Sequence, residues 1–519
     1  MDAPLFLALD QGTQSARAML FDVKGELVAK SQRHIEPYIS PAPGAAEQDA
    51  DYFWEELGQA CQRLWLDFPD LKERVIGVSL TTQRASVVCL DARKKPLRPA
   101  IIWLDQRRTA SPPRLPLWLS APVKLLGQGE TLRQFQAKAE CNWLAEDEPQ
   151  LWAKTAHFLL LSGYLTYRLT GELRDCTASQ VGYIPYDYKR CRWAPAHDLK
   201  WKALRLKPEQ LPELISPGET LGVISAAASR HTGIPEGLPV IASGADKACE
   251  VLGAGAFAPQ IGNLSYGTTA TFNTCNARYV EPIPFVPAYG AAAPGRYNSE
   301  IIVQRGYWMV NWFKREFARE EIDRAEQLGV APETLFEEFL EQTPPGAMGL
   351  TLQPFWNPGV RIPGPEAKGA IVGFGDVHTR AHLYRAIIEG IAYALREGKE
   401  RLEKRNGVKI THLKVSGGGS QSDAIMQVTA DIFGLPAERP HTSETSGLGA
   451  AINIAVAMKV YPDYDAAVEG MTRTGKVFLP RKEFSPLYDK LYRQVYKQLY
   501  PRLAPLYRSI RHITGYPAR

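Results

Sequence analysis

The chain has 519 residues, of which 45% are hydrophobic and 23% are charged, and its formal net charge is +5. This composition is that of an ordinary globular protein, and the length suggests two large domains. Because the net charge is small and no basic stripe is visible, we expect no nucleic-acid partner. Seven scattered cysteines without a CxxC pair favour reduced thiols, and with no leader or membrane-length apolar run we expect a cytoplasmic protein without membrane contact.

The first informative stretch is ALDQGTQSARAMLFD, residues 8 to 22. A short apolar strand ends at the carboxylate of Asp10, and the chain then turns through Gly12 and Thr13 into a second strand that contains Arg17. Such a bend exposes backbone N–H groups and hydroxyls, which suits it to hold phosphate, and the carboxylate lies where a phosphate-bound metal could be held. The same letters also fit an ordinary hairpin.

The rest of the first half alternates strands and helices. Residues 26–35 predict a third strand, a helix follows from Phe53, and residues 75–83 and 86–91 predict two further strands. This order is typical of an α/β domain of the ribonuclease H or actin-like kind. We also expect a helix over 135–152 and a second helix with a turn and a polar tail over 157–180.

Two places in this half offer polar groups for a ligand. In IIWLDQRRT, residues 101–109, Trp103 provides a flat apolar wall, while Asp105 and Arg107 could hydrogen-bond a polyol; the alternative is a strand end with a solvated charge pair. Further on, the strand PVIASG leads to Asp246 before a helix. A carboxylate at the end of a strand is where open α/β sheets place chemistry.

The second half repeats the phosphate-type turn and adds a glycine-rich one. NLSYGTTATFNT, residues 263–274, bends at Gly267, Thr268 and Thr269 like the opening hairpin without its aspartate, which suggests duplicated domains closing on a nucleotide. A triple glycine at 417–419 separates a strand from a helix, so backbone can approach a ligand closely there. It has neither the GxGxxG order nor the lysine of a P-loop. Residues 487–507 predict an amphipathic helix docked on the second domain.

These motifs together resemble those of the FGGY carbohydrate kinase family along nearly the whole chain. ALDQGTQSARA resembles the first phosphate motif, SGADKA the catalytic-base motif, YGTT the second phosphate motif, SGGGSQSDAIMQVTADIFG the adenosine motif, and GAIVGFGDVHTRAHLYRAIIEG the C-terminal signature.

The resemblance implies an α/β fold of two actin-like domains, 1–256 for the sugar and catalytic base and 257–519 for ATP, with the active site in the cleft between them. It implies transfer of the γ-phosphoryl of Mg-ATP to a hydroxyl of a keto-sugar or polyol. Asp246 would be the base and a possible metal contact, and Asp10 would hold Mg²⁺ through water. Dimers are frequent in the family, so a homodimer is compatible with it.

The remaining site residues fall into two groups by their expected ligand. For ATP and its phosphates we expect Gly12, Thr13, Gln14, Arg17, Gly267, Thr268, Thr269, Gly417, Gly418, Gly419 and Ser420. For the substrate we expect Gln83, Arg84, Trp103, Asp105, Phe135, Asp246 and Lys247.

The acceptor is predicted from departures within this resemblance. Ala85 stands where glycerol kinases carry a glutamate, Phe135 where they carry a tyrosine, and Lys247 where they carry a glutamine. Each lost hydrogen bond removes roughly 0.5–1.5 kcal/mol, which favours a pentulose such as xylulose or ribulose over glycerol. Lys247 could pair with a keto or carboxyl oxygen. Glycerol kinase stays open as the alternative, as do an ATP-binding regulator and a sugar sensor on the same fold.

Overall fold

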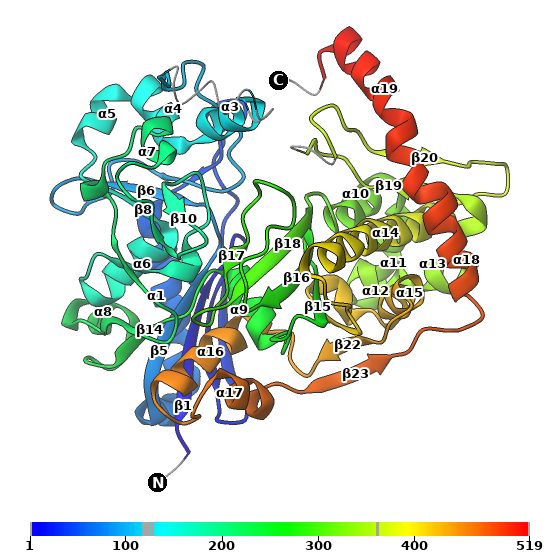
Figure 1. Ribbon diagram of the computed structural model, residues 1–519. Coiled ribbons are helices and arrows are strands. Elements are labelled where there is room, and N and C mark those ends of the chain that lie inside the picture. The colour runs from blue at the N-terminus through cyan, green and yellow to red at the C-terminus, as the bar shows by residue number, and fades with distance from the viewer. Residues whose placement is uncertain (1–2, 117–124, 126–128, 360–362, 517–519) are drawn as a thin grey trace.

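The computed structural model describes residues 3–116, 125, 129–359 and 363–516, and its two largest sheets lie in separate lobes (Figure 1). The first sheet has six strands in the order β13-β14-β5-β1-β2-β3. Their bounds are β1 Leu5–Gln11, β2 Ser15–Phe21, β3 Leu27–His34, β5 Val75–Thr82, β13 Thr220–Val223 and β14 Pro239–Ala242. β1, β5 and β14 run parallel, and β2 and β3 continue the sheet as antiparallel hairpins, as the sequence predicted for the opening segment.

Both faces of this sheet are covered by helices because β1 is apolar on both sides. Leu5, Leu7 and Leu9 pack in one core with α1 (Ala50–Asp67), whereas Phe6 and Ala8 pack in another with α16 (Thr445–Ala457). Strands buried on two faces carry apolar residues at successive positions rather than alternate ones. The carboxyl ends of the parallel strands therefore remain free at one edge.

A smaller sheet and a set of short helices stand on the first lobe. Its strands are β4 Glu47–Gln48, β6 Val87–Leu90, β7 Ala100–Ile101 and β8 His157–Leu160. The single helix expected over 135–152 is wrong: the segment forms α3 (Gly129–Lys138), α4 (Glu140–Asp147) and α5 (Pro149–Lys154). Pro149 opens α5 because proline has no N–H to continue the preceding helix.

The helix expected from residue 157 is also wrong at its start. The first four residues form β8, which pairs antiparallel with β6, and α6 (Leu161–Thr170) follows. The continuous apolar run suits a buried strand as well as a helix, so periodicity could not separate them. The expected polar tail contains β9 (Arg174–Cys176).

The second lobe is built on a seven-stranded sheet in the order β17-β18-β16-β15-β21-β22-β23. The strands are β15 Ile261–Tyr266, β16 Ala270–Asn276, β17 Tyr289–Gly290, β18 Tyr297–Val303, β21 His412–Ser416, β22 Ala437–Pro440 and β23 Thr474–Phe478. The hairpin expected over 263–274 is present, and the longest helix of this lobe is α14 (Arg380–Asn406). α10 (Trp308–Phe317) and α15 (Asp423–Phe433) pack with α14 in the core of this lobe.

Shorter elements connect these parts. In the first lobe they are α7 Leu199–Ala203, α8 Ala226–Thr232, α9 Asp246–Gly253, β10 Tyr186–Asp187, β11 Arg192–Trp193 and β12 Glu213–Ile215. In the second half of the chain they are α11 Arg319–Leu328, α12 Pro332–Leu335, α13 Glu337–Gln342, β19 Thr351–Gln353, β20 Ala370–Val372 and α17 Tyr464–Met471.

The chain returns to the first lobe near its end. α16 and α17 follow β22 in sequence, yet they pack against β1 and α9, and Figure 1 shows these orange helices beside the blue strands. The domain boundary at 256/257 stays a prediction. The return means that α16 links the two lobes at their base.

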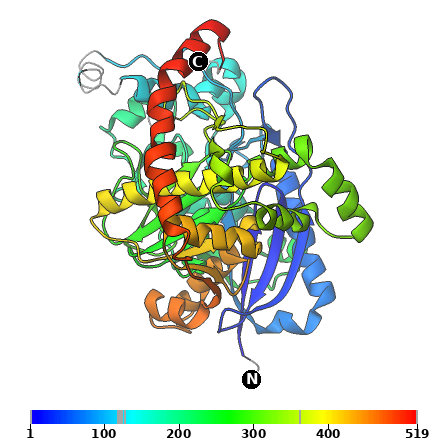
Figure 2. The same cartoon turned by 90° about the vertical axis from the view of Figure 1, so that its right-hand side faces the viewer.

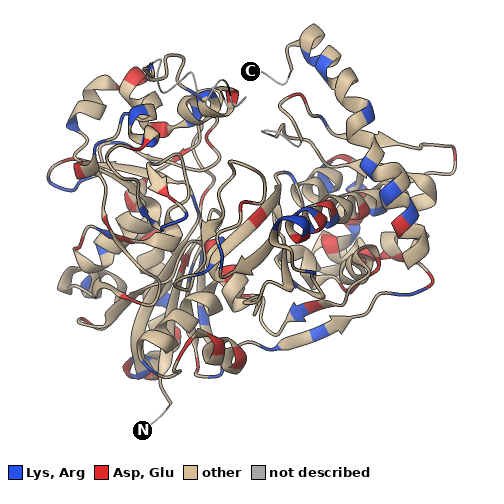
Figure 3. Cartoon of the chain, in the orientation of Figure 1, with Lys and Arg blue, Asp and Glu red and all other residues tan. Residues whose placement is uncertain are grey.

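The C-terminal tail packs on α14. It comprises α18 (Ser485–Lys490), a π-helical turn (Leu491–Tyr496) and α19 (Lys497–Thr514), which runs along one side of the second lobe (Figure 2). Tyr488, Tyr492 and Tyr496 are buried in the core that contains α14. Within the described ranges no helix is long and apolar enough to cross a membrane. Acidic and basic residues are interspersed along the chain in both lobes (Figure 3).

Candidate active site

The first phosphate-type turn leaves the sheet at the free edge of β1. Asp10 is buried with 5% exposure and lies opposite Arg17 on β2, whose Nη1 is 3.4 Å from its Oδ2. The same Nη1 lies 2.9 Å from Glu444 Oε2 at the start of α16. Burial raises the pKa of Asp10 to about 7, against the lowering effect of Arg17 and with further raising by Asp246, Glu444 and Glu250. The positive charge of Arg17 therefore does not fully offset the cost of burying an ionised Asp10.

The bend itself is tight, because Gly12 N–H donates to Ser15 O at 3.0 Å. Gln14 is exposed at the tip, and its carbonyl accepts from Ile35 N–H. Thr13 belongs to a hydrogen-bonded chain: Trp103 Nε1 donates to Thr13 Oγ1 at 2.9 Å.

Thr13 in turn donates to Gln83 Oε1 at 2.8 Å. Gln83 follows β5, and its N–H donates to Gln11 O, so β1 and β5 present their ends together. Its buried Nε2 has no partner within the part of the chain that the structure describes. Trp103 keeps 39% of its surface exposed and so offers a ring face beside this donor.

Asp246 opens α9 four residues beyond the end of β14. Its Oδ1 accepts from Lys247 N–H at 2.7 Å, and Arg84 Nε lies 4.0 Å from the same oxygen. Burial raises the pKa of Asp246, while Arg84 and Lys247 oppose the rise. Its side chain still keeps 31% of its surface exposed, so a ligand can reach it.

Arg84 is held from the second lobe. Its Nη1 and Nη2 donate to the two carboxylate oxygens of Glu300 on β18 at 2.6 and 3.0 Å. The guanidinium also lies 5.5 Å from the ring centre of Tyr289. The next residue, Ala85, has a φ of 54°, a left-handed conformation that is unusual outside glycine and directs the chain from β5 into β6.

Lys247 joins α9 to the second sheet. Its Nζ donates to Glu250 Oε2 and to Ser265 Oγ, both at 2.6 Å. Ser416 Oγ donates to the other Glu250 oxygen at 2.5 Å. Burial alone would raise the pKa of Glu250, but Lys247 and these hydroxyls hold it below its usual range. The expected contact of Lys247 with a keto or carboxyl oxygen therefore competes with an existing ion pair.

Ser265 and Ser416 lie opposite each other near the ends of β15 and β21, which run parallel. The turns that follow, at Gly267 and Gly417, therefore share one edge. Gly417 has a φ of 84°, and a Cβ there would lie 2.8 Å from Tyr266 backbone atoms, so only glycine fits.

The rest of this glycine-rich turn differs from residue to residue. A Cβ on Gly419 would clash with the Tyr307 ring, whereas one on Gly418 meets nothing within 4 Å. The open side of the turn is thus at Gly418. Ser420 is buried and donates its hydroxyl to Gly417 O at 2.7 Å, which leaves its hydroxyl proton engaged within the turn.

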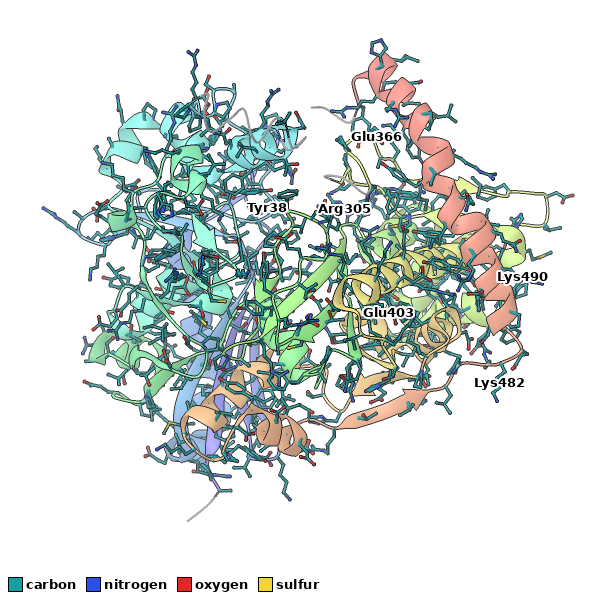
Figure 4. The ribbon with its side chains drawn as sticks, in the orientation of Figure 1. Tyr38, Arg305, Glu366, Glu403, Lys482 and Lys490 are labelled. Carbon is teal, nitrogen blue, oxygen red and sulfur yellow. The ribbon has the colours of Figure 1, made fainter. Side chains whose placement is uncertain are left out.

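The turn after β15 is braced by α10 and the end of β18. Gly267 O and Thr268 O accept from the N–H groups of Tyr307 and Trp308, and Thr269 Oγ1 donates to Gln304 O. The adjacent Arg305, labelled in Figure 4, is partly exposed and lies 5.0 Å from the ring centre of Trp308. It adds a positive charge beside the turn.

Two expected substrate residues have other surroundings. Asp105 accepts from Ala46 N–H and from the N–H and Nε of Arg107, so its oxygens are already used and it is not carried into the proposed site. Asp105 and Arg107 form an ion pair with each other, and this pair is largely buried rather than solvated. Phe135 lies on α3 with its ring 5.7 Å from Tyr183, and its role with a substrate stays a prediction.

The sequence analysis missed the partners supplied from afar. Glu300, Asn298 and Tyr289 face Arg84 and Lys247 across one small pocket, and Glu444 reaches Arg17. The polar residues Asn298 and Glu300 stand at alternate positions of the strand YNSEIIV, and this pattern could have indicated them. A charged residue on a buried strand requires a partner. Nothing in the sequence indicated which cation that partner would be.

No group of three or more His, Cys, Asp or Glu side chains suited to a metal occurs among the described residues. The site still fits Mg²⁺, which is usually bound by one or two carboxylates together with substrate phosphates and water. Asp10, at the end of β1, and Asp246, at the start of α9, are two carboxylates close enough for the charge of Asp246 to raise the pKa of Asp10.

Comparison with known proteins agrees with this geometry. The family models described as the N-terminal and C-terminal domains of the FGGY family of carbohydrate kinases match residues 5–253 and 262–458. A protein named uncharacterized sugar kinase YgcE, from Escherichia coli strain K12, is 30% identical over 492 residues, covering 94% of this chain and 92% of its own. The glycerol kinase of Dechloromonas aromatica is 27% identical over 486 residues, covering 91% and 93%.

The crystal structure of xylulose kinase from Rhodospirillum rubrum is similar with a TM-score of 0.81 and 26% identity, covering 97% of this chain and 100% of that one. The fold is therefore the two-domain actin-like α/β fold expected from the sequence. Kinases of this kind transfer a phosphoryl group to an alcohol. The chain belongs to the FGGY family of carbohydrate kinases.

Proposed function

We propose that this kinase transfers the γ-phosphoryl of ATP, with Mg²⁺, to a hydroxyl of a keto-sugar such as xylulose or ribulose or of a related polyol, and that glycerol is a poor acceptor. The observation that carries the proposal is the position of Asp246: it is exposed to a ligand, lies beside Arg84, and starts α9, the helix that is bonded to Ser265 and Ser416 just before the turns at Gly267 and Gly417.

The chemistry follows from the groups at this edge. A sugar hydroxyl is a weak nucleophile, and Asp246 would orient it and accept its proton as the loose transition state of phosphoryl transfer forms. The pKa of Asp246 is raised by burial, which makes the carboxylate a better proton acceptor than an exposed one. Arg84, 4.0 Å away, would keep it ionised in the resting enzyme and hold an adjacent oxygen of the sugar.

The phosphates would lie between the two turns. Arg17, Thr13 and Thr268 would donate to phosphoryl oxygens, where preorganised donors stabilise developing charge. Bound Mg²⁺ would supply additional neutralisation of the phosphate charge, with Asp10 holding it through water. Gly418, the open side of its turn, would lie along the adenosine.

The acceptor is inferred from what surrounds Asp246. Ala85 provides no side-chain hydrogen bond at the position where a glutamate would favour glycerol, whereas the exposed face of Trp103 suits the apolar face of a longer sugar. The buried Gln83 Nε2 is an additional donor for a hydroxyl.

A coupled assay of ADP release tests the proposal. D-Xylulose, D-ribulose and the related pentitols should be turned over with a higher kcat/KM than glycerol. Equal turnover of glycerol would contradict the acceptor assignment and favour the glycerol kinase alternative. Asp246→Ala should abolish ADP release with every acceptor, and full activity of that variant would contradict its role.

A further inference from the structure

A polar wall on the second sheet faces the proposed substrate residues. Asn273 on β16 pairs with Glu300 on β18, and Tyr289 on β17 pairs with Asn298, two residues before Glu300 on the same face of the strand. All four side chains line one pocket with Arg84 and Lys247 of the first lobe. We call these four residues the β18 wall.

Glu300 removes most of the anion-binding capacity of Arg84. A planar guanidinium binds a carboxylate best by two parallel hydrogen bonds, and Glu300 already occupies that arrangement. The Glu300 side chain keeps only 2% of its surface exposed, so solvent does not compete for it. The Nε of Arg84 faces Asp246, and no pair of guanidinium N–H groups remains free to bind a second carboxylate.

The charges that remain do not favour an anionic substrate. Arg84 and Lys247 supply two positive charges, and Asp246, Glu250 and Glu300 supply three negative ones, so the cluster has one net negative charge. An acceptor with its own carboxylate would add a fourth negative group with no unengaged cation among the described pocket residues. Burying a charge without a partner is strongly unfavourable.

The wall also contains an unused hydrogen-bond acceptor. Asn298 is buried with 4% exposure, and its Oδ1 has no partner within the ranges that the structure describes. A buried acceptor left unpaired costs free energy, so a donor is needed there. The pocket has room for about one water-sized group, which is the size of a sugar hydroxyl.

From these observations we infer that the β18 wall makes the kinase selective for uncharged, polyhydroxylated acceptors: Glu300 excludes sugar acids by engaging Arg84, and Asn298 Oδ1 accepts a hydrogen bond from a hydroxyl of the acceptor. The inference rests on the proposed function because it concerns the substrate of the same site. It assigns to the second lobe a part in choosing the sugar.

Equilibrium binding measurements test the selectivity for the acceptor without requiring phosphoryl transfer. Calorimetric titrations with a non-hydrolysed ATP analogue present would compare three- to six-carbon polyols and ketoses with aldonates of the same length. The full-length protein should bind at least one neutral compound more tightly than every aldonate. Tighter binding of an aldonate, or no saturable binding of any neutral compound, would overturn the inference.

Glu300→Gln tests the exclusion of sugar acids. The variant leaves Arg84 without a charged partner, so its preference for neutral over acidic compounds should fall by about tenfold or more, since hydrogen bonds to charged groups are the stronger ones. The matched control is Glu338→Gln, which removes another bidentate partner, that of Arg324, on the exposed side of the second lobe. An unchanged preference in a folded Glu300→Gln protein would contradict the role of Glu300.

Asn298→Leu tests the hydroxyl contact independently. It keeps a similar size and removes the acceptor, so affinity for the best neutral compound should fall by about 2- to 10-fold while affinity for the ATP analogue is unchanged. Unchanged sugar affinity would contradict the contact. Selective binding of a neutral sugar without any ADP release would instead leave the selectivity intact and contradict the proposed function.

Discussion

Asp10→Asn is expected to make the ligand-free protein more stable while it disables the site. Asp10 is buried with 5% exposure, and burial raises its pKa from 3.8 to about 7 despite Arg17. A rise of about three units corresponds to an upper limit of about 4 kcal/mol of unfavourable free energy when the carboxylate is ionised, at 1.36 kcal/mol for each unit. Asparagine has the same shape and no charge, and we expect a gain of about 1–3 kcal/mol because its amide still requires partners.

The direction of the pH dependence follows from the raised pKa. Well below pH 3.8 the carboxyl is protonated in both the folded and the unfolded chain, so the stabilities of wild type and variant should differ least there. Between pH 4 and pH 7 the carboxyl is mostly ionised in the unfolded chain and still mostly protonated in the folded chain. The folded wild type therefore loses stability as the pH rises. Above pH 7 the carboxylate is ionised in both states, and the advantage of Asp10→Asn should reach a plateau.

Thermal unfolding from pH 4 to pH 8 without Mg²⁺ or nucleotide measures this difference. Asp147→Asn, at the exposed end of α4, controls for the substitution itself. An advantage of Asp10→Asn that is constant with pH, or that decreases toward pH 8, would refute the reasoning. With Mg²⁺ and an ATP analogue added, wild type should gain stability and the variant should gain less.

Three further outcomes are expected. Asp246→Asn should lower kcat by about 10²- to 10⁴-fold in the coupled assay, the usual contribution of a general base, and leave binding of an ATP analogue nearly unchanged. Gly417→Ala should lower the melting temperature and weaken nucleotide binding in a titration, because its Cβ would meet the Tyr266 backbone at 2.8 Å in a left-handed conformation, whereas Gly418→Ala should be tolerated. Trp103→Phe keeps a ring but loses the 2.9 Å hydrogen bond to Thr13, so KM for the sugar should rise a few-fold with little change in kcat.

Patterns within one segment predicted most of the fold. The opening hairpin, the strand at 75–82, the second hairpin and α14 follow from local alternation or helical period. One failure occurred where a strand and a helix share one apolar run, and the other where a single helix was expected across Pro149, which opens a new helix. His157–Leu160 became a strand only because β6 lies beside it, which is a tertiary contact that the segment itself does not specify.

For the site, too, the sequence predicted local positions better than long-range contacts. Asp10, Gly267, Gly417 and Asp246 stand at the ends of strands or at the start of a helix, and their positions follow from local sequence. What their side chains contact does not. Lys247 was predicted to meet a sugar oxygen, yet Glu250 and Ser265 hold its ammonium, and Ser265 belongs to the other lobe.

Ion pairs between distant segments of the chain explain why the substrate could not be derived from the first domain alone. Glu300 reaches Arg84 across 216 residues of sequence, and Glu444 reaches Arg17 across 427. Each pair places a carboxylate of the second half of the chain next to an arginine of the first half that we propose binds a ligand. The affinity of Arg84 for an anion therefore depends on the position of the second lobe, which carries Glu300, so selectivity should change if the lobes separate, whereas Glu444 packs with α16 on the first lobe and stays with Arg17. A substitution of Glu300 or Glu444 should therefore change the ligand preference of the paired arginine, although the arginine itself is unchanged.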